Sequence, residues 1–313
     1  MNIIFFGSSE FALPALEELL EAGNKISCVI TQEDKKQGRG MQIRYTPIKE
    51  FALKNGLNIF QPDNINSPQS SEFLKKHQPD LFIVAAYGQI LSPEILAIPK
   101  IMPLNIHGSL LPSFRGAAPI NWAVIKGESK TGVSIIKMSP RMDAGPIILT
   151  KQTAIEENDD ALTLENKLSE LGAQAMLESI SLIKSGKYTL IPQEENKATL
   201  APKLKKDNGR INWEDSALNI RNLIRGCLGW PDAFTSYNGK ILKILKAQDT
   251  GHKAQEKNKP GTIIQVSPEG ILVATGEGSL LIKELQLEGK KRMPSADFVA
   301  GHKIKPGEIL DNF

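Results

Sequence analysis

The sequence predicts an α/β fold: a Rossmann-like, doubly wound, mostly parallel sheet followed by a small C-terminal β-barrel domain that is OB-like. The chain has 313 residues, which is about two domains at ~100–200 residues each. Residues 1–150 alternate apolar runs with helical patterns, as is typical of a parallel sheet that helices cover on both faces. The last third holds short strand-like pieces separated by Gly, Asn and Pro, which indicates a small barrel or sandwich.

Apolar runs and helix signals define the elements of the first domain. The runs predict strands at residues 2–6, 26–31, 81–86, 103–107 and 132–138. Helical patterns predict helices at residues 11–20, 46–55 and 160–185, and another that begins at Ser67-Pro68. Thr46-Pro47 combines an N-cap with a proline at the first helical position, whereas Gly23 and Gly186 end helices.

A stretch without sustained periodicity separates the two predicted domains. Lys187–Lys206 holds two prolines, so we expect a first domain over 1–188, a linker over 189–206 and a second domain over 207–313. In the second domain, the patterns predict a helix at 215–227 and strands at 234–237, 241–245, 261–266, 270–274 and 280–287.

The composition excludes several classes of protein. Hydrophobic residues make up 41% and charged residues 23% of the chain, which excludes a wholly disordered or collagen-like protein. No apolar run approaches the ~18–20 residues that cross a bilayer, so no membrane association is expected. The start of the chain lacks the basic region of a signal peptide. Cys28 and Cys227 stand apart, and we expect buried free thiols in a reducing cytoplasm.

Charge is unevenly distributed although the net charge is only +3. Residues 205–313 carry 17 Lys and Arg against 13 Asp and Glu, whereas residues 1–204 carry 21 against 22. This basic bias is compatible with a polyanionic partner, and the alternative is a solvated face with excess lysine.

The turn after the first strand argues against a nucleotide cofactor. It reads Phe6-Gly7-Ser8-Ser9-Glu10 and lacks the further glycines of the G-x-G-x-x-G fingerprint, so NAD and FAD are not expected. The sequence contains no P-loop, no H-E-x-x-H motif and no Cys/His cluster with zinc spacing, so no metal is expected.

Asn105 and His107 lie at the carboxyl end of a predicted buried strand, where α/β sheets place their sites. Strand alternation directs both side chains to the same face. An amide and an imidazole side by side can donate to a carbonyl oxygen that becomes an oxyanion, while the imidazole also handles a proton. The alternative is a strand-end histidine that bonds to local backbone.

Asp143 extends this pair to an amide, an imidazole and a carboxylate. It lies in the loop after the strand that ends near Met138, and that strand end should lie beside the strand that carries His107. A carboxylate there could orient His107 and order a water. An ordinary turn aspartate is the alternative. The set as a whole fits transfer of a carbonyl group to an amine.

These residues belong to motifs that resemble a known family. The motifs read Asn105-x-His107-x-Ser109-Leu110-Leu111-Pro112, Arg115-Gly116-Ala117-Ala118-Pro119-Ile120 and Met142-Asp143-Ala144-Gly145. Together they resemble the formyltetrahydrofolate-dependent formyltransferases. Gly38-Arg39-Gly40 and Gly226-x-x-x-Trp230-Pro231-x-Ala233 are similar to the members that formylate methionyl initiator tRNA, and the resemblance runs essentially from end to end.

The resemblance implies formyl transfer from 10-formyltetrahydrofolate, as co-substrate, to the amino group of methionyl initiator tRNA, for translation initiation. It implies that Asn105, His107 and Asp143 are catalytic. It implies folate contacts for Ser109, Leu110, Leu111 and Pro112, and for the turn Tyr87, Gly88, Gln89, Ile90 and Leu91. We also expect a cytoplasmic monomer without an obligate protein partner.

One departure and one basic loop accompany the resemblance. Position 113 is Ser where relatives often have a basic residue, so a charge contact there is not expected.

Gln32–Tyr45 is longer than a usual βα loop. Its cations Lys35, Lys36, Arg39 and Arg44, together with Lys205 and Lys206, are expected to contact tRNA. The alternative for the loop is a solvated segment with incidental charge.

Two other functions are open at this point. Relatives that formylate small amines, such as an amino-sugar nucleotide or glycinamide ribotide, resemble residues 101–146 but should lack the basic loop and Trp230-Pro231. An RNA-binding protein with an inactive α/β domain is the other alternative. The presence of Asn105, His107 and Asp143 argues against it.

Overall fold

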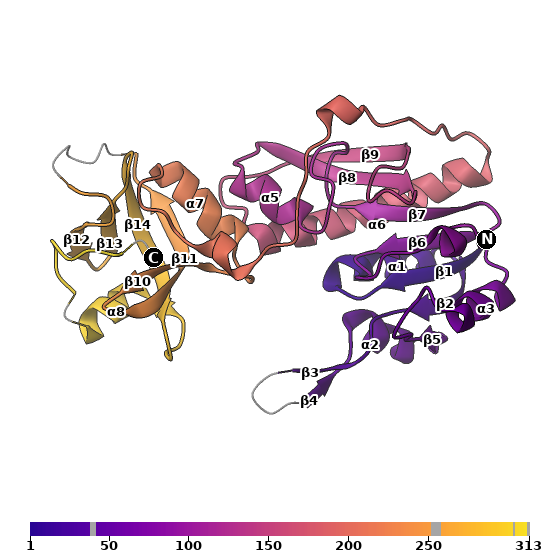
Figure 1. The fold of residues 1–313 in the computed structure, drawn as a ribbon, viewed down its shortest axis with the longest axis horizontal. Helices are drawn as coiled ribbons and strands as arrows, with labels where there is room; N and C mark the ends of the chain where they lie inside the picture. The colour runs from indigo at the N-terminus through magenta and orange to yellow at the C-terminus, as the bar shows by residue number, and fades with distance from the viewer. Residues whose placement is uncertain (38–41, 252–257, 303, 312–313) are drawn as a thin grey trace. The chain divides into compact units, whose positions relative to one another are not determined.

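The computed structural model describes residues 1–37, 42–251, 258–302 and 304–311 (Figure 1). The chain forms two compact units, each assembled from separate segments. The first unit comprises Met1–Pro119, Lys130–Ala154 and Glu165–Pro202, and the second comprises Ile120–Ser129, Ile155–Leu164 and Lys203–Phe313. The segments 120–129 and 155–164 therefore group with the C-terminal part of the chain.

A seven-stranded sheet forms the centre of the first unit, in the order β5-β2-β1-β6-β7-β8-β9. The strands are β1 (Asn2–Gly7), β2 (Lys25–Ile30), β5 (Ile59–Phe60), β6 (Leu81–Ala85), β7 (Met102–His107), β8 (Lys130–Lys137) and β9 (Ile147–Ala154). The strands from β5 to β7 are parallel, whereas β8 is antiparallel to β7 and β9 to β8. The predicted mostly parallel sheet is confirmed, and β5 and β9 are additions to it.

Helices α2 (Pro47–Lys54) and α3 (Pro68–Lys76) begin where their sequence signals predict, and α1 (Leu13–Glu21) and α6 (Ala161–Lys184) lie close to the predicted ranges. The short 3₁₀ turn η1 (Glu10–Ala12) precedes α1, and α4 (Pro93–Leu96) is an addition. Helix α6 begins in the segment that groups with the second unit and continues into the first. The hydroxyls of Thr46, Ser67 and Ser92 accept from backbone N–H groups in the first turns of α2, α3 and α4, each ahead of a proline. Such caps satisfy N–H groups that would otherwise lack a partner.

Residues 32–45, which the sequence predicts as a loop, contain a two-stranded antiparallel ribbon. Its strands are β3 (Lys35–Gln37) and β4 (Gln42–Arg44), and their register pairs Lys35 with Arg44. The long connection after β2 is therefore partly ordered by its own backbone pairing.

The backbone of the segment between α6 and residue 202 forms bridges with other segments of the first unit. It contains the 3₁₀ turn η2 (Glu195–Lys197). Isolated bridges pair Ile147 with Ile191 and Arg115 with Leu200. The backbone of this predicted linker is thus bonded to β9 and to the segment after β7.

The second unit is a small antiparallel β domain, as expected. Its strands β10 (Ala233–Tyr237), β11 (Lys240–Asp249), β12 (Ile263–Ser267), β13 (Gly270–Ala274) and β14 (Ser279–Leu287) follow the order β10-β11-β14-β13-β12, and β15 (Met293–Pro294) pairs with β14. Helices α5 (Pro119–Ile125), α7 (Ala217–Gly226) and α8 (Ser295–Gly301) and the turn η3 (Lys206–Gly209) complete it.

The last described residues connect the two edges of this sheet. Ile309 bridges Thr262 ahead of β12, and Asp311 bridges Ser236 of β10. Unpaired edges invite association, so their bridging protects the sheet in the way a closed barrel does. The domain is built around Trp213, which is fully buried and donates from its indole Nε1 to the Thr235 hydroxyl at 3.0 Å.

Three general features accompany this fold. Among the described residues, no helix combines the length and apolar character needed to cross a membrane. The same part of the chain holds no group of three or more His, Cys, Asp or Glu side chains arranged to bind a metal. Cys28 and Cys227 are free and buried, as predicted, and burial raises the pKa of each thiol to about 12.

Candidate active site

Asn105 and His107 project from the same face of β7. Between them, Ile106 faces α6: its Cγ2 lies 2.8 Å from where a Cβ on Gly172 would stand. Because successive side chains alternate across a strand, Asn105 and His107 lie on the face opposite α6. His107 is buried, whereas Asn105 is half-buried.

The two ring nitrogens of His107 have different neighbours. Nε2 lies 2.9 Å from the carbonyl oxygen of Phe114. Because a carbonyl only accepts, Nε2 carries the hydrogen and donates it. Nδ1 is then the nitrogen that faces Asp143, 3.6 Å from its Oδ2. The backbone contact considered as an alternative is thus present, yet it leaves the second nitrogen available for chemistry.

Asp143 reaches His107 by a different route from the expected one. Since β8 runs antiparallel to β7, its last residue Lys137 pairs with Leu104, nearer the start of β7 than His107 is. The loop after β8 therefore folds back along β7 before it presents Asp143, which has a left-handed φ of +50°. The predicted proximity of Asp143 to His107 is present, but loop geometry rather than the strand end creates it.

Gly116 and Gly145 allow this loop to approach its neighbours closely. The backbone N–H of Gly116 donates to Oδ2 of Asp143 at 2.9 Å. A Cβ on Gly116 would stand 2.5 Å from the carbonyl oxygen of Ala201, and one on Gly145 would stand 1.8 Å from that of Lys137. Only glycine fits at both places, which explains two glycines of the sequence motifs.

The Asn105 amide is the unengaged member of the set. Its side chain makes no hydrogen bond to another residue in the described part of the chain. A preorganised amide N–H aimed at developing negative charge is a typical oxyanion donor. The geometry therefore combines an available amide, an imidazole and a carboxylate that a backbone N–H holds in place.

The segment Ser109–Pro112 is shaped by internal hydrogen bonds. The Ser109 hydroxyl donates to the carbonyl oxygen of Ser113 at 2.6 Å, and Ser134 of β8 bonds to the backbone of Ser109 and Leu111. Leu111 is buried, and Leu110 and Pro112 are half-buried. Leu110 and Pro112 are therefore the members of this predicted folate set with exposed surface to offer.

The turn Tyr87–Leu91 follows β6, the parallel neighbour of β7. Tyr87 and Leu91 are buried, and burial raises the pKa of the Tyr87 phenol. Gln89 braces the turn: its Oε1 accepts from the N–H of Ile65, and its Nε2 donates to the carbonyls of residues 62 and 63. Gly88 and Ile90 are exposed, and Ile90 is 69% exposed.

The predicted tRNA contacts fall in both units. The backbones of Lys35 and Lys36 lie in β3, and Arg44 at the end of β4 is exposed. Arg39 lies outside the described residues. Lys205 and Lys206 are exposed at the start of η3, in the second unit.

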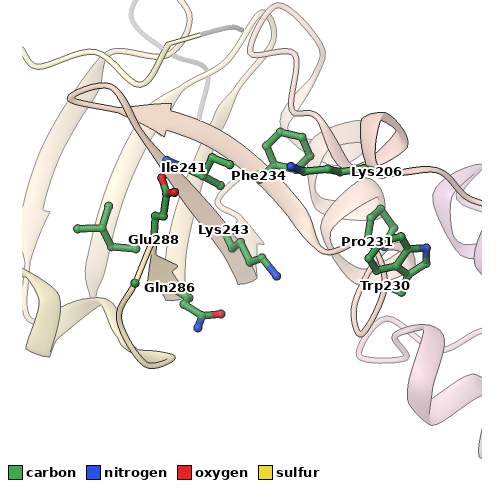
Figure 2. Close-up of a pocket in the computed structure, with 10 residues that line it drawn as sticks. Lys206, Trp230, Pro231, Phe234, Ile241, Lys243, Gln286 and Glu288 are labelled. Atoms are coloured by element: carbon green, nitrogen blue, oxygen red, sulfur yellow. Dashed lines mark hydrogen bonds between the residues drawn. The ribbon is translucent and has the colours of Figure 1, made fainter. Parts of the chain in front are cut away.

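An open cavity of about 300 Å³ lies beside Lys206 in the second unit. Figure 2 shows Trp230 and Pro231 on one side of it, Gln286 and Glu288 on the other, and Lys243 between. Trp230 is 60% exposed, so most of its ring is available for contact. An exposed indole beside ammonium groups is a combination that binds single-stranded nucleic acid.

A polar network that was not predicted from the sequence supports the Asp143 loop. Gln193 donates to the carbonyls of Asp143 and Gly145, and it accepts from Arg115, which also pairs with Glu195. Gln193 and Arg115 are 78 positions apart in the chain. The motif that contains Arg115 is visible in the sequence, but nothing there identifies its partners.

Comparison with known proteins defines the class of this chain. Residues 1–180 match the family model of formyl transferases, and residues 203–303 match that of the formyl transferase C-terminal domain. The chain belongs to the formyl transferase family.

Two similar proteins of this family match nearly the whole chain. The methionyl-tRNA formyltransferase of Caldanaerobacter subterraneus is 44% identical over 311 residues, covering 99% of this chain and 100% of that protein. The methionyl-tRNA formyltransferase of Alkaliphilus oremlandii is 44% identical over 310 residues, covering 99% of both.

Solved structures share the fold. The sugar 3N-formyltransferase WlaRD, solved in the presence of dTDP and 5-N-formyl-THF, aligns with a TM-score of 0.68 at 19% identity, covering 93% of this chain and 99% of that one. HypX from Aquifex aeolicus, solved with tetrahydrofolic acid, aligns with a TM-score of 0.66 at 20% identity. The alignment covers 99% of this chain and 50% of HypX, so this chain spans half its length.

Proposed function

We propose that this chain transfers the formyl group of 10-formyltetrahydrofolate to the amino group of methionyl initiator tRNA, for use in translation initiation. The observation that carries the proposal is the full-length similarity to methionyl-tRNA formyltransferases at 44% identity. The placement of His107 Nδ1 3.6 Å from the Asp143 carboxylate supports it chemically.

The proposed chemistry assigns one task to each group. The methionyl amine attacks the formyl carbon, so a new C–N bond forms and the carbonyl oxygen becomes an oxyanion. Asn105 donates to that oxyanion, and His107 donates to it from Nδ1 when that nitrogen carries a proton. Asp143 orients His107 and takes the proton of the amine, directly or through water. The bond from the formyl carbon to the folate nitrogen then breaks, and that nitrogen gains a proton.

Formyl-folate is the donor, and we propose that it contacts two neighbouring strand ends. The turn Tyr87–Leu91 after β6 and the segment Ser109–Pro112 after β7 both follow parallel strands at the same edge of the sheet. Sites in α/β sheets lie at this carboxyl edge. The exposed residues Gly88 and Ile90 and the half-buried Leu110 and Pro112 are the proposed contact surfaces.

We propose that the C-terminal domain and the basic ribbon bind tRNA. The proposed contacts are Lys35, Lys36, Arg39, Arg44, Lys205 and Lys206. The cavity beside Lys206 and Trp230 supports a contact to an unpaired nucleotide. In functional terms, residues 1–188 carry catalysis and 207–313 bind tRNA. Residues 189–206 link the two, and within them 191–201 also bond to the first unit. The protein acts in the cytoplasm as a monomer without an obligate protein partner.

The test compares acceptors with the same formyl donor. Purified protein is incubated with 10-formyltetrahydrofolate and methionyl initiator tRNA, glycinamide ribotide or an amino-sugar nucleotide. The proposal predicts rapid formylation of the methionyl tRNA and negligible formylation of the small amines. Preferred formylation of a small amine would contradict it, and tRNA binding without transfer would identify an RNA-binding protein instead.

A further inference from the structure

Gln193 holds the backbone of the loop that carries Asp143. Its Nε2 donates to the carbonyl oxygens of Asp143 and Gly145, both at 2.7 Å. An amide nitrogen has two hydrogens, so each carbonyl takes one. The two bonds flank Ala144 and thereby fix the backbone on the carboxyl side of the left-handed residue Asp143.

Arg115 binds the other end of the same amide. Oε1 of Gln193 accepts from Nε of Arg115 at 3.0 Å and from Nη2 at 2.8 Å. Because a guanidinium only donates and backbone carbonyls only accept, these partners determine which end of the amide is oxygen. Both hydrogens and the oxygen of Gln193 are engaged, so its orientation is defined on two sides.

Arg115 is itself immobilised. It is only 6% exposed, and Nη1 and Nη2 each lie 3.1 Å from a carboxylate oxygen of Glu195. Hydrogen bonds from Arg115 and then Arg141 lower the pKa of Glu195 to about 2. The backbone of Arg115 is bonded to Thr199 at 2.8 Å and to Ala201 at 2.7 Å. Segment 191–201 thus anchors the guanidinium.

The network reaches the reactive carboxylate from two directions. Gly116, which follows Arg115, donates its N–H to Oδ2 of Asp143 at 2.9 Å. The side chain of Arg115 reaches the backbone of Asp143 through Gln193. The Asp143 carboxylate is therefore bonded to the N–H of the residue after Arg115, and the Asp143 backbone is bonded to the Arg115 side chain through Gln193. Together these contacts hold the carboxylate 3.6 Å from His107.

We propose that Gln193 is a positioning residue for formyl transfer, which directs the Asp143 carboxylate toward His107 without touching either substrate. This inference rests on the proposed function. Small displacements of a catalytic group reduce the rate of the chemical step, by up to ~10²-fold for 1 Å. Loss of the Gln193 contacts should therefore lower kcat and leave KM for tRNA and for folate nearly unchanged.

The first test uses Gln193→Glu. The new carboxylate keeps the shape and can still pair with Arg115, but it cannot donate to the two loop carbonyls. Gln152→Glu is the matched control: Gln152 is exposed on β9, and its side chain has no hydrogen bond to another described residue. We expect a fall in kcat of ~10-fold or more, KM values within about twofold, and no change in the control. Equal kcat for both variants overturns the proposal.

A double-mutant cycle separates positioning from general support of the fold. If Gln193 acts through the carboxylate, Gln193→Glu should cost little further activity in an Asp143→Asn background. If the double variant loses activity by the full product of the two single-variant factors, the proposal is overturned. Gln193→Met removes the same bonds without adding charge, and it must show the same non-additive pattern. It serves as the test if the Glu variant does not fold.

Hydrogen exchange provides a readout that does not depend on activity. In Gln193→Glu, the Gly116 amide and the peptide over 139–147 should exchange faster, while the peptides of β1 and β6 stay as in the wild type. Unchanged exchange at these positions overturns the positioning role. A wild-type protein that fails to formylate methionyl tRNA contradicts the proposed function instead, and exchange still decides the role of Gln193.

Discussion

At the scale of single residues, one ring nitrogen of His107 makes a structural hydrogen bond and the other is available for catalysis. Nε2 is committed to the carbonyl oxygen of Phe114, whereas Nδ1 faces Asp143. Neighbouring Asn105 makes no side-chain bond within the described residues. These contacts define which atoms are left for substrates: the amide of Asn105, Nδ1 of His107 and the carboxylate of Asp143.

Asn105→Ala should lower kcat by ~10²-fold or more, because it removes one donor to the oxyanion. The free amide has no structural bond to lose, so we expect thermal unfolding and tRNA affinity to match the wild type. Steady-state formylation kinetics measure the loss, and filter binding measures the affinity. A kcat within twofold of wild type would show that the oxyanion donor is another group.

Glu195→Gln should reduce stability in a pH-dependent way. The arginines lower the pKa of the Glu195 carboxyl from 4.5 to about 2. The stability that the charged carboxylate contributes is therefore complete above pH 4.5 and is lost as the pH falls through about 2. In urea unfolding, the difference between the variant and the wild type should be constant above about pH 5 and should shrink below it. A difference that does not change with pH contradicts this charge pairing.

At the scale of elements, the signals that lie close together in the sequence predict the structure well. The caps at Thr46 and Ser67 predict α2 and α3, and apolar runs predict β1, β6 and β7. The fold-back of the Asp143 loop could not be predicted, because the antiparallel direction of β8 depends on long-range pairing. The bonding of residues 191–201 beside the site is equally long-range, so an aperiodic segment with two prolines resembles a linker.

Arg39→Ala tests the basic segment Gln32–Tyr45. A guanidinium between Gly38 and Gly40 can read features of the acceptor end of the tRNA. Its loss should therefore cost more than ~1 kcal/mol in kcat/KM for initiator tRNA. The Lys35/Lys36 double alanine variant should instead weaken all tRNAs alike and flatten the salt dependence. Equal, small losses for initiator and elongator methionyl tRNA on changing Arg39 would place discrimination elsewhere.

Trp230→Ala tests the cavity of the second unit. Loss of a stacking surface should weaken tRNA binding by ~1–3 kcal/mol, and kcat at saturating tRNA should stay close to wild type. Lys75→Ala, an exposed lysine of α3, is the control for nonspecific effects. Unchanged tRNA affinity in Trp230→Ala would exclude the cavity as a nucleotide contact.

At the scale of the whole molecule, the compact units do not follow a single cut in the chain. Asn121 donates to the carbonyl oxygen of Gly226 at 2.9 Å although 105 positions separate them. Arg225 donates to the carbonyl oxygen of Asp159 at 2.9 Å. Composition and periodicity locate the change in strand pattern near residue 206, but they cannot show that 120–129 and 155–164 pack with α7.

A chain that ends at residue 205 should therefore be less stable than the full protein. The cut removes α7 from α5 and exposes the apolar side of Ile120–Ile125, which favours aggregation. Thermal unfolding and light scattering of both chains measure the effect, and we expect a lower unfolding temperature and association of the shorter chain. A monomeric fragment that unfolds at the same temperature would show that these contacts contribute little.

The central claim is that Asp143, held beside His107, serves formyl transfer to methionyl initiator tRNA. Single-turnover formylation by enzyme saturated with both substrates measures the chemical step directly. We predict that Asp143→Asn slows this step by ~10²-fold or more, with tRNA affinity and thermal unfolding close to wild type. A single-turnover rate equal to that of the wild type would contradict the account.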